Sequence, residues 1–467
     1  MTELLPPRQF CFDYHSSPDV IWTSEQGTFS REYSLRPESV LRSGGGNVSP
    51  LVADWVEIAF ATYFSDRLAR RRDHRDRGRG TQWRRRMTLR LGVRVPDFWS
   101  SQQVQTALTS CLEFLTEDTW NFEFLPRHAA PWDVEHQTVL IDPPTNPSAG
   151  VMLYSGGLDS FAGIANHLTD DHSEWMLISG APNLRHRVQQ LSQVKAIRHS
   201  TKRPICHLLI PYSLGYVGDA PVEEQSQRAR SFLFLTLGAI AAARVGAATL
   251  LMCENGIGAI NLPLDETQIG TSNARAAHPA TLVRFNRLAR LLLGADFRVR
   301  NPFWNITKGE ACNTANVREL AHVIGETFSC DKFPIRVANM PQCGTCTSCL
   351  LRRASLNAAN LQAFDSGSRY LRDVVSPNAR LRTHSLEGLH VMEWQFQRLH
   401  EALRASDSWR ALCAAFPDVR RAAVAYQELE KVSAGAVNQQ LVRLYSQYVT
   451  EWEQFPARSR LRLSKAA

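Results

Sequence analysis

The chain has 467 residues, of which 44% are hydrophobic and 21% charged, a composition typical of folded proteins that excludes a mostly disordered chain. Its 26 Gly and 23 Pro follow no period, which excludes a collagen-like protein. No stretch approaches the ~20 apolar residues that a membrane span needs. The first residues, MTELLPPRQFCFDY, lack the basic and apolar regions of a secretory signal. We therefore expect a cytoplasmic protein without a membrane partner.

The net charge of +8 is concentrated in one segment. Residues 67–86 contain ten Arg and two Asp, so this window alone carries +8 and the remainder is neutral. Such a run is typical of a contact with an anion or a nucleic acid. It is equally typical of a solvated, arginine-rich surface loop, which we favour.

Residues 1–146 are predicted to form an N-terminal domain of mixed α+β structure. Met87–Val95 alternates apolar and polar residues, which indicates a half-buried strand. Apolar residues then recur at helical spacing from Val104 to Leu115, and Trp120–Phe124 alternates again. We identify no catalytic motif in this part of the sequence.

Residues 147–325 alternate short apolar runs with helical segments, which predicts an α/β fold with a doubly wound parallel sheet covered on both faces. Ligands of such sheets bind beyond the carboxyl ends of the strands. The predicted strands are Val151–Tyr154, Trp175–Ser179, Cys206–Ile210, Thr249–Cys253 and Phe297–Val299, and the predicted helices are Asp159–Leu168, Leu184–His199, Gln225–Arg244, Pro279–Leu292 and Thr307–Val323.

The strongest motif follows the first of these strands and opens a helix. It is the run Tyr154, Ser155, Gly156, Gly157, Leu158, Asp159 and Ser160. A helix N-terminus presents unpaired N–H groups and a positive dipole, and two glycines let the backbone approach a phosphate closely. The run therefore predicts an anion-binding loop, although a helix-capping turn would use similar residues. No lysine follows as in a Walker loop.

The run SGGLDS resembles the pyrophosphate-binding loop of the PP-loop ATPases, a family with a HUP-like sheet. Members of that family cleave ATP between its α and β phosphates and form an adenylate of the substrate. The resemblance implies that Tyr154–Ser160 holds ATP and that Mg²⁺ is the counter-ion.

A second cluster, Cys330, Cys343, Cys346 and Cys349, lies in the predicted segment 326–360. Four thiolates suit a tetrahedral Zn²⁺ with no open position for water, so the site would be structural. A CxxCxxC run also occurs in iron–sulfur proteins, and four unligated thiols are the third alternative. From 361 to 467 the sequence predicts helices, most simply a packing or interaction region.

The order of the two motifs resembles the 7-cyano-7-deazaguanine synthase (QueC) family, over residues 147–357. That family uses ATP to activate the carboxylate of 7-carboxy-7-deazaguanine, which ammonia converts to an amide and then a nitrile. Asn301–Trp304 and Lys308 resemble the family's stretch before the zinc segment. Arg230–Ser231 resembles its Arg–Asn pair before an apolar helix.

The sequence departs from that family in its long first cysteine gap, in residues 254–279, and in its added N- and C-terminal regions. This layout resembles the longer QueC-like proteins of bacterial antiviral operons, the Qat type. The resemblance implies a role in anti-phage defence and a protein partner encoded in the same operon.

We assign candidate roles to the remaining polar residues. Asp159, Arg230 and Lys308 are the candidate catalytic residues, with the two cations contacting phosphate or carboxylate. The candidate substrate-binding residues are Glu254, Asn255, Arg275 and His278. Each has a structural alternative: a surface charge for the arginines and Lys308, an Asn-Gly turn for Glu254 and Asn255, and a loop cap for His278.

The sequence thus predicts ATP-dependent adenylation of a 7-deazapurine carboxylate and transfer to a nitrogen nucleophile, either ammonia or an amine of a partner protein. One alternative is a tRNA-modifying enzyme whose basic segment contacts RNA, which we do not favour because the clustered cysteines are expected to hold metal. The other is a nucleotide-binding scaffold without turnover.

Overall fold

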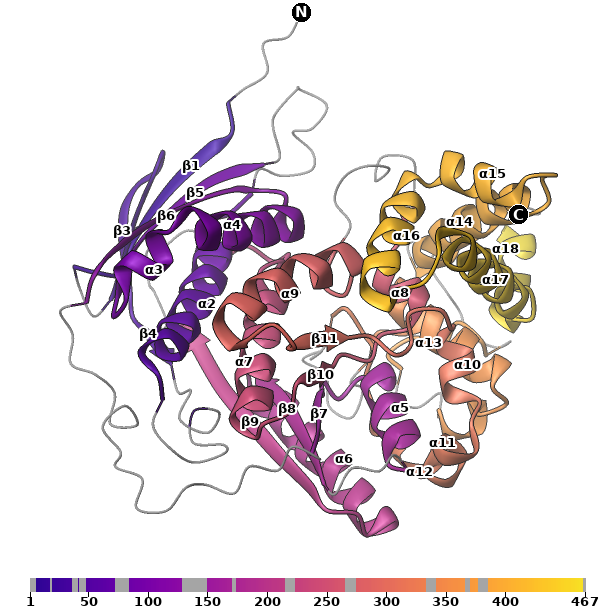
Figure 1. The fold of residues 1–467 in the computed structure, drawn as a ribbon. Helices are drawn as coiled ribbons and strands as arrows, with labels where there is room; N and C mark the ends of the chain where they lie inside the picture. Colours follow the sequence, from indigo (N-terminus) through magenta and orange to yellow (C-terminus); the bar gives the residue numbers. More distant parts are fainter. Residues whose placement is uncertain are drawn as a thin grey trace, which may run out of the picture.

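The computed structural model describes residues 6–16, 19–35, 41, 48–71, 84–127, 149–169, 174–214, 223–264, 274–332, 342–365, 370–376 and 385–464. Figure 1 shows two sheets with helices between them and a group of helices near the C-terminus. Within these ranges, we find no helix with the length and apolar character that crossing a membrane requires.

The N-terminal sheet has five strands in the order β3-β2-β1-β5-β6. The strands β1, β2 and β3 pair antiparallel, whereas β5 runs parallel to both β1 and β6. Both strands predicted here and the helix between them are present. The elements of this part are β1 (Arg8–Asp13), β2 (Val20–Ser24), β3 (Gly27–Arg31), β4 (Tyr33–Leu35), α2 (Pro50–Leu68), β5 (Arg85–Val93), α3 (Pro96–Ser100), α4 (Gln102–Thr116) and β6 (Thr119–Pro126).

The central sheet has six strands in the order β11-β10-β7-β8-β9-β4, and all its pairs are parallel except that of β4 with β9. The predicted parallel α/β sheet is therefore confirmed. Its strands and helices are β7 (Gly150–Leu153), α5 (Leu158–His167), β8 (Trp175–Ala181), α6 (Leu184–Thr201), β9 (Ile205–Leu214), α7 (Arg230–Arg244), β10 (Thr249–Leu251), α8 (Gly256–Ile260), α9 (Pro279–Leu293) and β11 (Arg298–Arg300).

Two predicted helices differ from the structure. The predicted helix Gln225–Arg244 begins only at Arg230, which leaves the residues before it in an irregular segment. The predicted helix Thr307–Val323 is three short helices, α10 (Lys308–Cys312), α11 (Ala315–Glu319) and α12 (Ala321–Ile324). Thr314 caps α11 by accepting the N–H of Val317, and such a hydroxyl starts a new helix rather than continuing the old one.

Helices cover both faces of the central sheet, because its strands are apolar on both sides. Val151 belongs to the core that includes α7 and α9, and the next residue, Met152, belongs to the core that includes α5 and α6. Successive side chains of a strand point to opposite faces, so one continuous apolar run supplies two cores.

The N-terminal part packs on the α7 and α9 side of the central sheet. Its edge strand β4 pairs with β9, and the ring of Trp55 in α2 stacks on Phe285 in α9 with centroids 5.7 Å apart. Buried residues of both parts form one core. The predicted boundary at 146 stays a prediction, and the hydrophobic core crosses it.

The C-terminal helices form a separate core against α8 and α13 (Figure 1). Buried apolar residues of these helices, such as Leu441 and Leu444 of α17, pack with Ile257 of α8 and Leu350 of α13. The helices of this part are α13 (Thr347–Ala358), α14 (Glu387–Leu403), α15 (Ser408–Ala415), α16 (Pro417–Glu430), α17 (Ala434–Glu453) and α18 (Ser459–Ser464).

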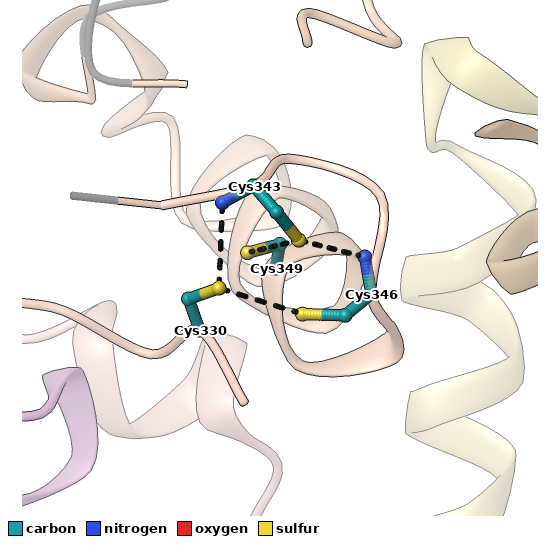
Figure 2. Close-up of side chains that lie close together, drawn as sticks. All are labelled: Cys330, Cys343, Cys346 and Cys349. Carbon is teal, nitrogen blue, oxygen red and sulfur yellow. Dashed lines mark hydrogen bonds between the residues drawn. The ribbon is translucent and has the colours of Figure 1, made fainter. Parts of the chain in front are cut away.

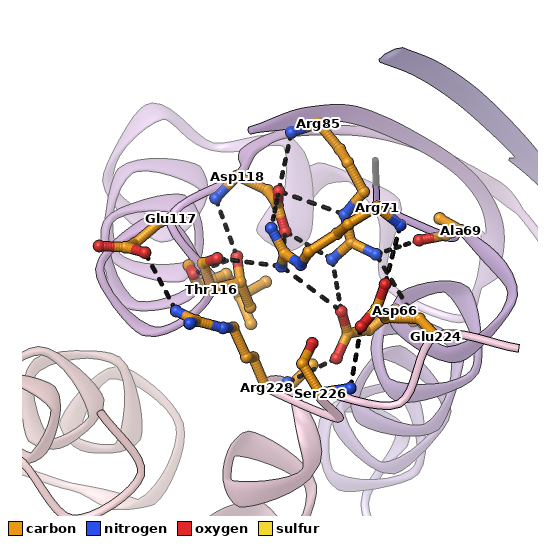
Figure 3. Close-up of polar contacts among 12 residues, drawn as sticks. Asp66, Ala69, Arg71, Arg85, Thr116, Glu117, Asp118, Glu224, Ser226 and Arg228 are labelled. Atoms are coloured by element: carbon orange, nitrogen blue, oxygen red, sulfur yellow. Dashed lines mark hydrogen bonds and ion pairs between the residues drawn. The ribbon is translucent and has the colours of Figure 1, made fainter. Parts of the chain in front are cut away.

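Two arginines at the described ends of the arginine-rich run are buried, whereas Arg70, Arg84 and Arg86 are exposed as a solvated segment would be. Arg71 and Arg85 are buried, and each forms an ion pair with Asp118 at 2.6 Å (Figure 3). Asp66 of α2 lies 2.5 Å from Arg85 and completes the cluster. Burial opposes ionisation of Asp118, but the two guanidiniums outweigh it and lower the pKa of this carboxyl. Residues 72–83, the middle of the predicted basic segment, lie outside the described residues.

We predict that Asp118→Asn destabilises the protein strongly, because it leaves two buried guanidiniums with one carboxylate. Breaking a buried ion pair costs about 3–5 kcal/mol, which urea unfolding would measure. The control is Glu428→Gln, whose partner Arg287 is exposed, so the loss should stay below about 1 kcal/mol. Equal effects of the two substitutions would contradict a role for this buried cluster.

Candidate active site

A pocket of about 490 Å³ opens at the carboxyl ends of β7, β8, β9 and β10. This is the edge at which parallel sheets bind their ligands. Its wall includes Ser155, Gly157, Asp159 and Ser160 of the predicted phosphate loop.

The phosphate loop turns sharply at Gly156, whose φ of +85° disfavours any residue with a side chain. A Cβ at this position would lie 2.9 Å from the ring of Phe328. The N–H of Phe328 donates to the carbonyl of Gly156 at 3.2 Å, so the segment before the cysteines supports the turn directly. Ser155 and Ser160 face each other with hydroxyl oxygens 3.2 Å apart at the start of α5.

Two glutamines of α6 hold the loop from behind, and the sequence analysis missed both. Gln190 donates to the carbonyl of Ser155 at 3.0 Å, and Gln193 donates to that of Gly156 at 3.1 Å. Gln193 also accepts the hydroxyl of Tyr154, which is buried. The sequence offered no signal for them, because the buried face of α6 has only Val194 and Ile197 beside the two glutamines, while Leu184, Val188 and Leu191 of the same helix are exposed.

Asp159 is the centre of a compact polar cluster. Its carboxylate lies 2.7 Å from the ammonium of Lys308 and accepts the side-chain amide of Asn255 at 2.9 Å. The same amide donates to Glu254 at 3.0 Å. Asp159, Glu254 and Lys308 all line the pocket. Three residues that are about 50 to 150 positions apart in the chain thus place two carboxyl groups and one cation together.

The cluster holds a proton on Glu254. Burial, with the neighbouring charge of Asp159, raises the pKa of Glu254 to about 8. Burial opposes the charged form of Lys308, but the Asp159 and Glu254 carboxyl groups outweigh it and raise the pKa of the lysine. At neutral pH the charged pair is therefore Asp159 and Lys308. Glu254 is then a neutral acid that can donate as well as accept a hydrogen bond.

The structure separates the other predicted residues into two groups. Arg230, at the first turn of α7, and Arg275 line the pocket. Asn255 and His278 are not among the residues that line it, and both are buried. Asn255 caps α8 by accepting the N–H of Gly258, and His278 caps α9 by accepting the N–H of Ala280. Their positions favour the structural alternatives.

The N-terminal part contributes to the pocket through Glu117, which follows α4. Its carboxylate lies 3.0 Å from Arg228 and 2.8 Å from Arg275, two residues of the pocket wall. Figure 3 shows Glu117 and Arg228 beside the buried Asp118 cluster. Burial lowers the pKa of Arg228 to about 10 despite this partner. One carboxylate thus holds two guanidiniums in place.

The four clustered cysteines converge as predicted (Figure 2). All their sulfur atoms lie within 4.8 Å of one another, and the pairs Cys343–Cys349 and Cys330–Cys346 are 4.0 Å apart. Four sulfurs bound to one Zn²⁺ at ~2.3 Å lie about 3.8 Å apart in a tetrahedron. A multi-iron cluster holds its thiolates farther apart, because several atoms lie between them. The geometry suits a single tetrahedral ion.

The cysteine segment and the phosphate loop share the pocket. Phe328, Ser329, Cys330 and Asp331 all line it. The N–H groups of Lys332 and Cys343 point at the sulfur of Cys330, at 3.4 and 3.3 Å, as donors to a thiolate would. A metal at the four sulfurs would therefore fix the segment that supports the phosphate turn.

Comparison with known proteins places this site in a family. Residues 149–360 match the family model of the queuosine biosynthesis protein QueC. The chain is also 27% identical over 254 residues to a 7-cyano-7-deazaguanine synthase of Novosphingobium aromaticivorans, a match that covers 49% of this chain and 97% of that enzyme. No solved structure matches the chain.

The central segment is therefore a QueC-like domain, a PP-loop fold with a four-cysteine cluster. At the level of the family it is an ATP-using ligase that forms a carbon–nitrogen bond.

We predict that Cys343→Ser lowers bound zinc from about one ion per chain to a small fraction of that value. The melting temperature should fall, and ATP binding should weaken because the support of Gly156 is lost. Elemental analysis, thermal unfolding and calorimetry measure the three effects. Cys11→Ser, at an exposed cysteine outside the cluster, should change none of them. Unchanged metal content in Cys343→Ser would contradict the site.

We predict that Glu254→Gln removes a pH dependence of stability. The folded protein keeps a proton on Glu254 up to about pH 8, whereas the unfolded chain loses it near 4.5. Between these values wild-type stability therefore falls as pH rises, by up to about 1.4 kcal/mol per pH unit, and levels off above them. The variant should lack this component in urea unfolding at pH 5.5 to 8.5. If the stability of wild type and of the variant changes with pH in the same way, Glu254 ionises normally.

Proposed function

We propose that the protein uses ATP to activate the carboxylate of a 7-deazapurine, such as 7-carboxy-7-deazaguanine, and transfers the activated carbonyl to a nitrogen nucleophile. The observation that carries the proposal is the phosphate loop and the Asp159–Lys308 pair in one pocket, inside a QueC-like domain. The relative named as 7-cyano-7-deazaguanine synthase supports the substrate class.

The reaction that suits this pocket has two steps. A carboxylate oxygen of the substrate attacks the α-phosphorus of ATP, the bond between the α-phosphorus and its bridging oxygen breaks, and pyrophosphate leaves. The nitrogen nucleophile then attacks the resulting acyl-adenylate, loses a proton, and releases AMP with formation of an amide. Conversion of that amide to a nitrile would consume a second ATP and remove the elements of water.

These steps require alignment and charge neutralisation more than acid–base catalysis. We assign the pyrophosphate end of ATP to the N–H groups and hydroxyls of residues 155–160. Lys308 and Arg230 would neutralise charge on the phosphates, with Asp159 holding the lysine. Mg²⁺ would supply further neutralisation. We assign Zn²⁺ to the four cysteines, where it would have a structural role.

The nitrogen nucleophile is either ammonia or an amine of a partner protein. We propose the partner amine, because the N- and C-terminal regions outside residues 149–360 both touch the pocket or the turns that form it. Free ammonia would not need such regions, whereas a macromolecule needs a surface on which to dock. We propose a role in anti-phage defence only from the resemblance of this layout to the Qat-type proteins.

We predict that the protein releases pyrophosphate when given ATP, Mg²⁺, 7-carboxy-7-deazaguanine and a nitrogen donor. Asp159→Ala should lower the rate about 10²-fold, the loss typical of a missing charge-positioning group. Asp296→Ala, at an exposed residue of the same domain, is the control.

Wild-type protein that binds ATP but releases no pyrophosphate with any donor would exclude the proposal and favour a scaffold. Release that needs tRNA in place of the deazapurine would favour tRNA modification.

A further inference from the structure

The residue Lys308 is the first residue of α10, a helix of only five residues. A single helical turn is not stable in isolation, because nucleation costs more than its few hydrogen bonds return. The position of the Lys308 ammonium against Asp159 must therefore depend on what holds this turn. Part of the answer is local, since Thr307 and Glu310 form a capping box.

The other part comes from the far end of the chain. Glu451 of α17 is 2% exposed, and its carboxylate accepts the hydroxyl of Thr307. The Thr307 hydroxyl has one proton, so donating it to Glu451 leaves a lone pair for the N–H of Glu310, which lies 3.0 Å away. Glu451 thus orients the cap itself.

The turn has no room for a side chain where Glu451 sits. A Cβ on Gly309 would lie 2.6 Å from one carboxylate oxygen of Glu451 and 2.7 Å from the other. Thr307 precedes Lys308 and Gly309 follows it, so the glutamate lies against the neighbours of the lysine on both sides. The close approach makes the contact specific, because the turn and the glutamate exclude any larger residue.

A second residue of α17 holds the same turn from its exposed side. Arg443 lies 2.5 Å from the carboxylate of Glu310 and also donates to the carbonyl of Asn305. This ion pair is partly exposed to solvent, and such pairs contribute less than buried ones. The buried contact of Glu451 therefore dominates.

We infer that Glu451 is a positioning residue of the reaction: the C-terminal region, outside the QueC-like segment, holds Lys308 in place against Asp159. The inference rests on the proposed function, which gives Lys308 its role. It gives the C-terminal helices a part in the active site through this contact.

The test compares Glu451→Ala with Glu451→Gln and with a matched control, Glu453→Ala. Glutamine keeps an acceptor for Thr307, so it should restore the turn in part. Glu453 lies on the same helix but is 46% exposed and pairs with His400 at 3.7 Å. A fourth variant, Gly309→Ala, displaces the glutamate without removing its carboxyl group.

The first measurement does not depend on activity. An amine-reactive acetylating reagent followed by peptide mass spectrometry gives the reaction rate of each lysine. In wild-type protein Lys308 should be protected, because it is buried and paired. Glu451→Ala and Gly309→Ala should raise the rate at Lys308 at least about tenfold, with the exposed Lys202 and Lys431 unchanged. Glu453→Ala should have no effect.

The second measurement is pyrophosphate release. Glu451→Ala should lower kcat by up to about 10²-fold with KM for ATP nearly unchanged, since displacement by about 1 Å can cost that much. The kcat of Glu451→Gln should lie between those of wild type and Glu451→Ala. Unchanged protection of Lys308 in Glu451→Ala and Gly309→Ala, or a uniform rise at all lysines, would overturn the inference. If wild-type protein releases no pyrophosphate, the proposed function fails, and the labelling experiment still decides the role of Glu451.

Discussion

The left-handed turn at Gly156 is the constraint on which the site depends. It directs the start of α5 into the pocket, and it is stable only because Phe328 fills the space beside it and α6 satisfies its carbonyls. Phe328 stands two residues before Cys330. The short segment from Phe328 to Cys330 therefore connects the four sulfurs to the phosphate loop. For this reason we expect a structural metal at the sulfurs to affect nucleotide binding.

Carboxylates from outside the QueC-like segment reach inward to this site. Glu117 holds Arg228 and Arg275 in the pocket wall, and Glu451 holds the turn that carries Lys308. In each case the carboxylate is buried, so the interaction is strong and costly to break. The N-terminal and C-terminal parts therefore both contact residues that form the pocket or the turns beside it.

The charge distribution has a similar explanation. The arginine-rich run supplies the net charge of the chain, yet Arg71 and Arg85 are used to build a buried network with Asp66 and Asp118. The network stands beside Glu117 (Figure 3). Two arginines of a run that was expected to be solvated therefore hold the start of β5 against α2, beside the residue that contacts the pocket wall.

The sequence by itself determined the parallel sheet, the phosphate loop and the four-cysteine cluster. Each rests on neighbouring residues, because apolar runs, paired glycines and CxxC spacings impose local geometry wherever they occur. Only the tertiary structure decided the partners of those motifs. Gln190 lies far along the chain from the phosphate loop, Glu117 from the pocket arginines, and Glu451 from Lys308. Each residue contacts its partner only because helices pack against one another in the fold. The role of a single side chain depends on the residues that surround it in the fold. A single residue has no repeating spacing in the sequence from which those neighbours could be predicted.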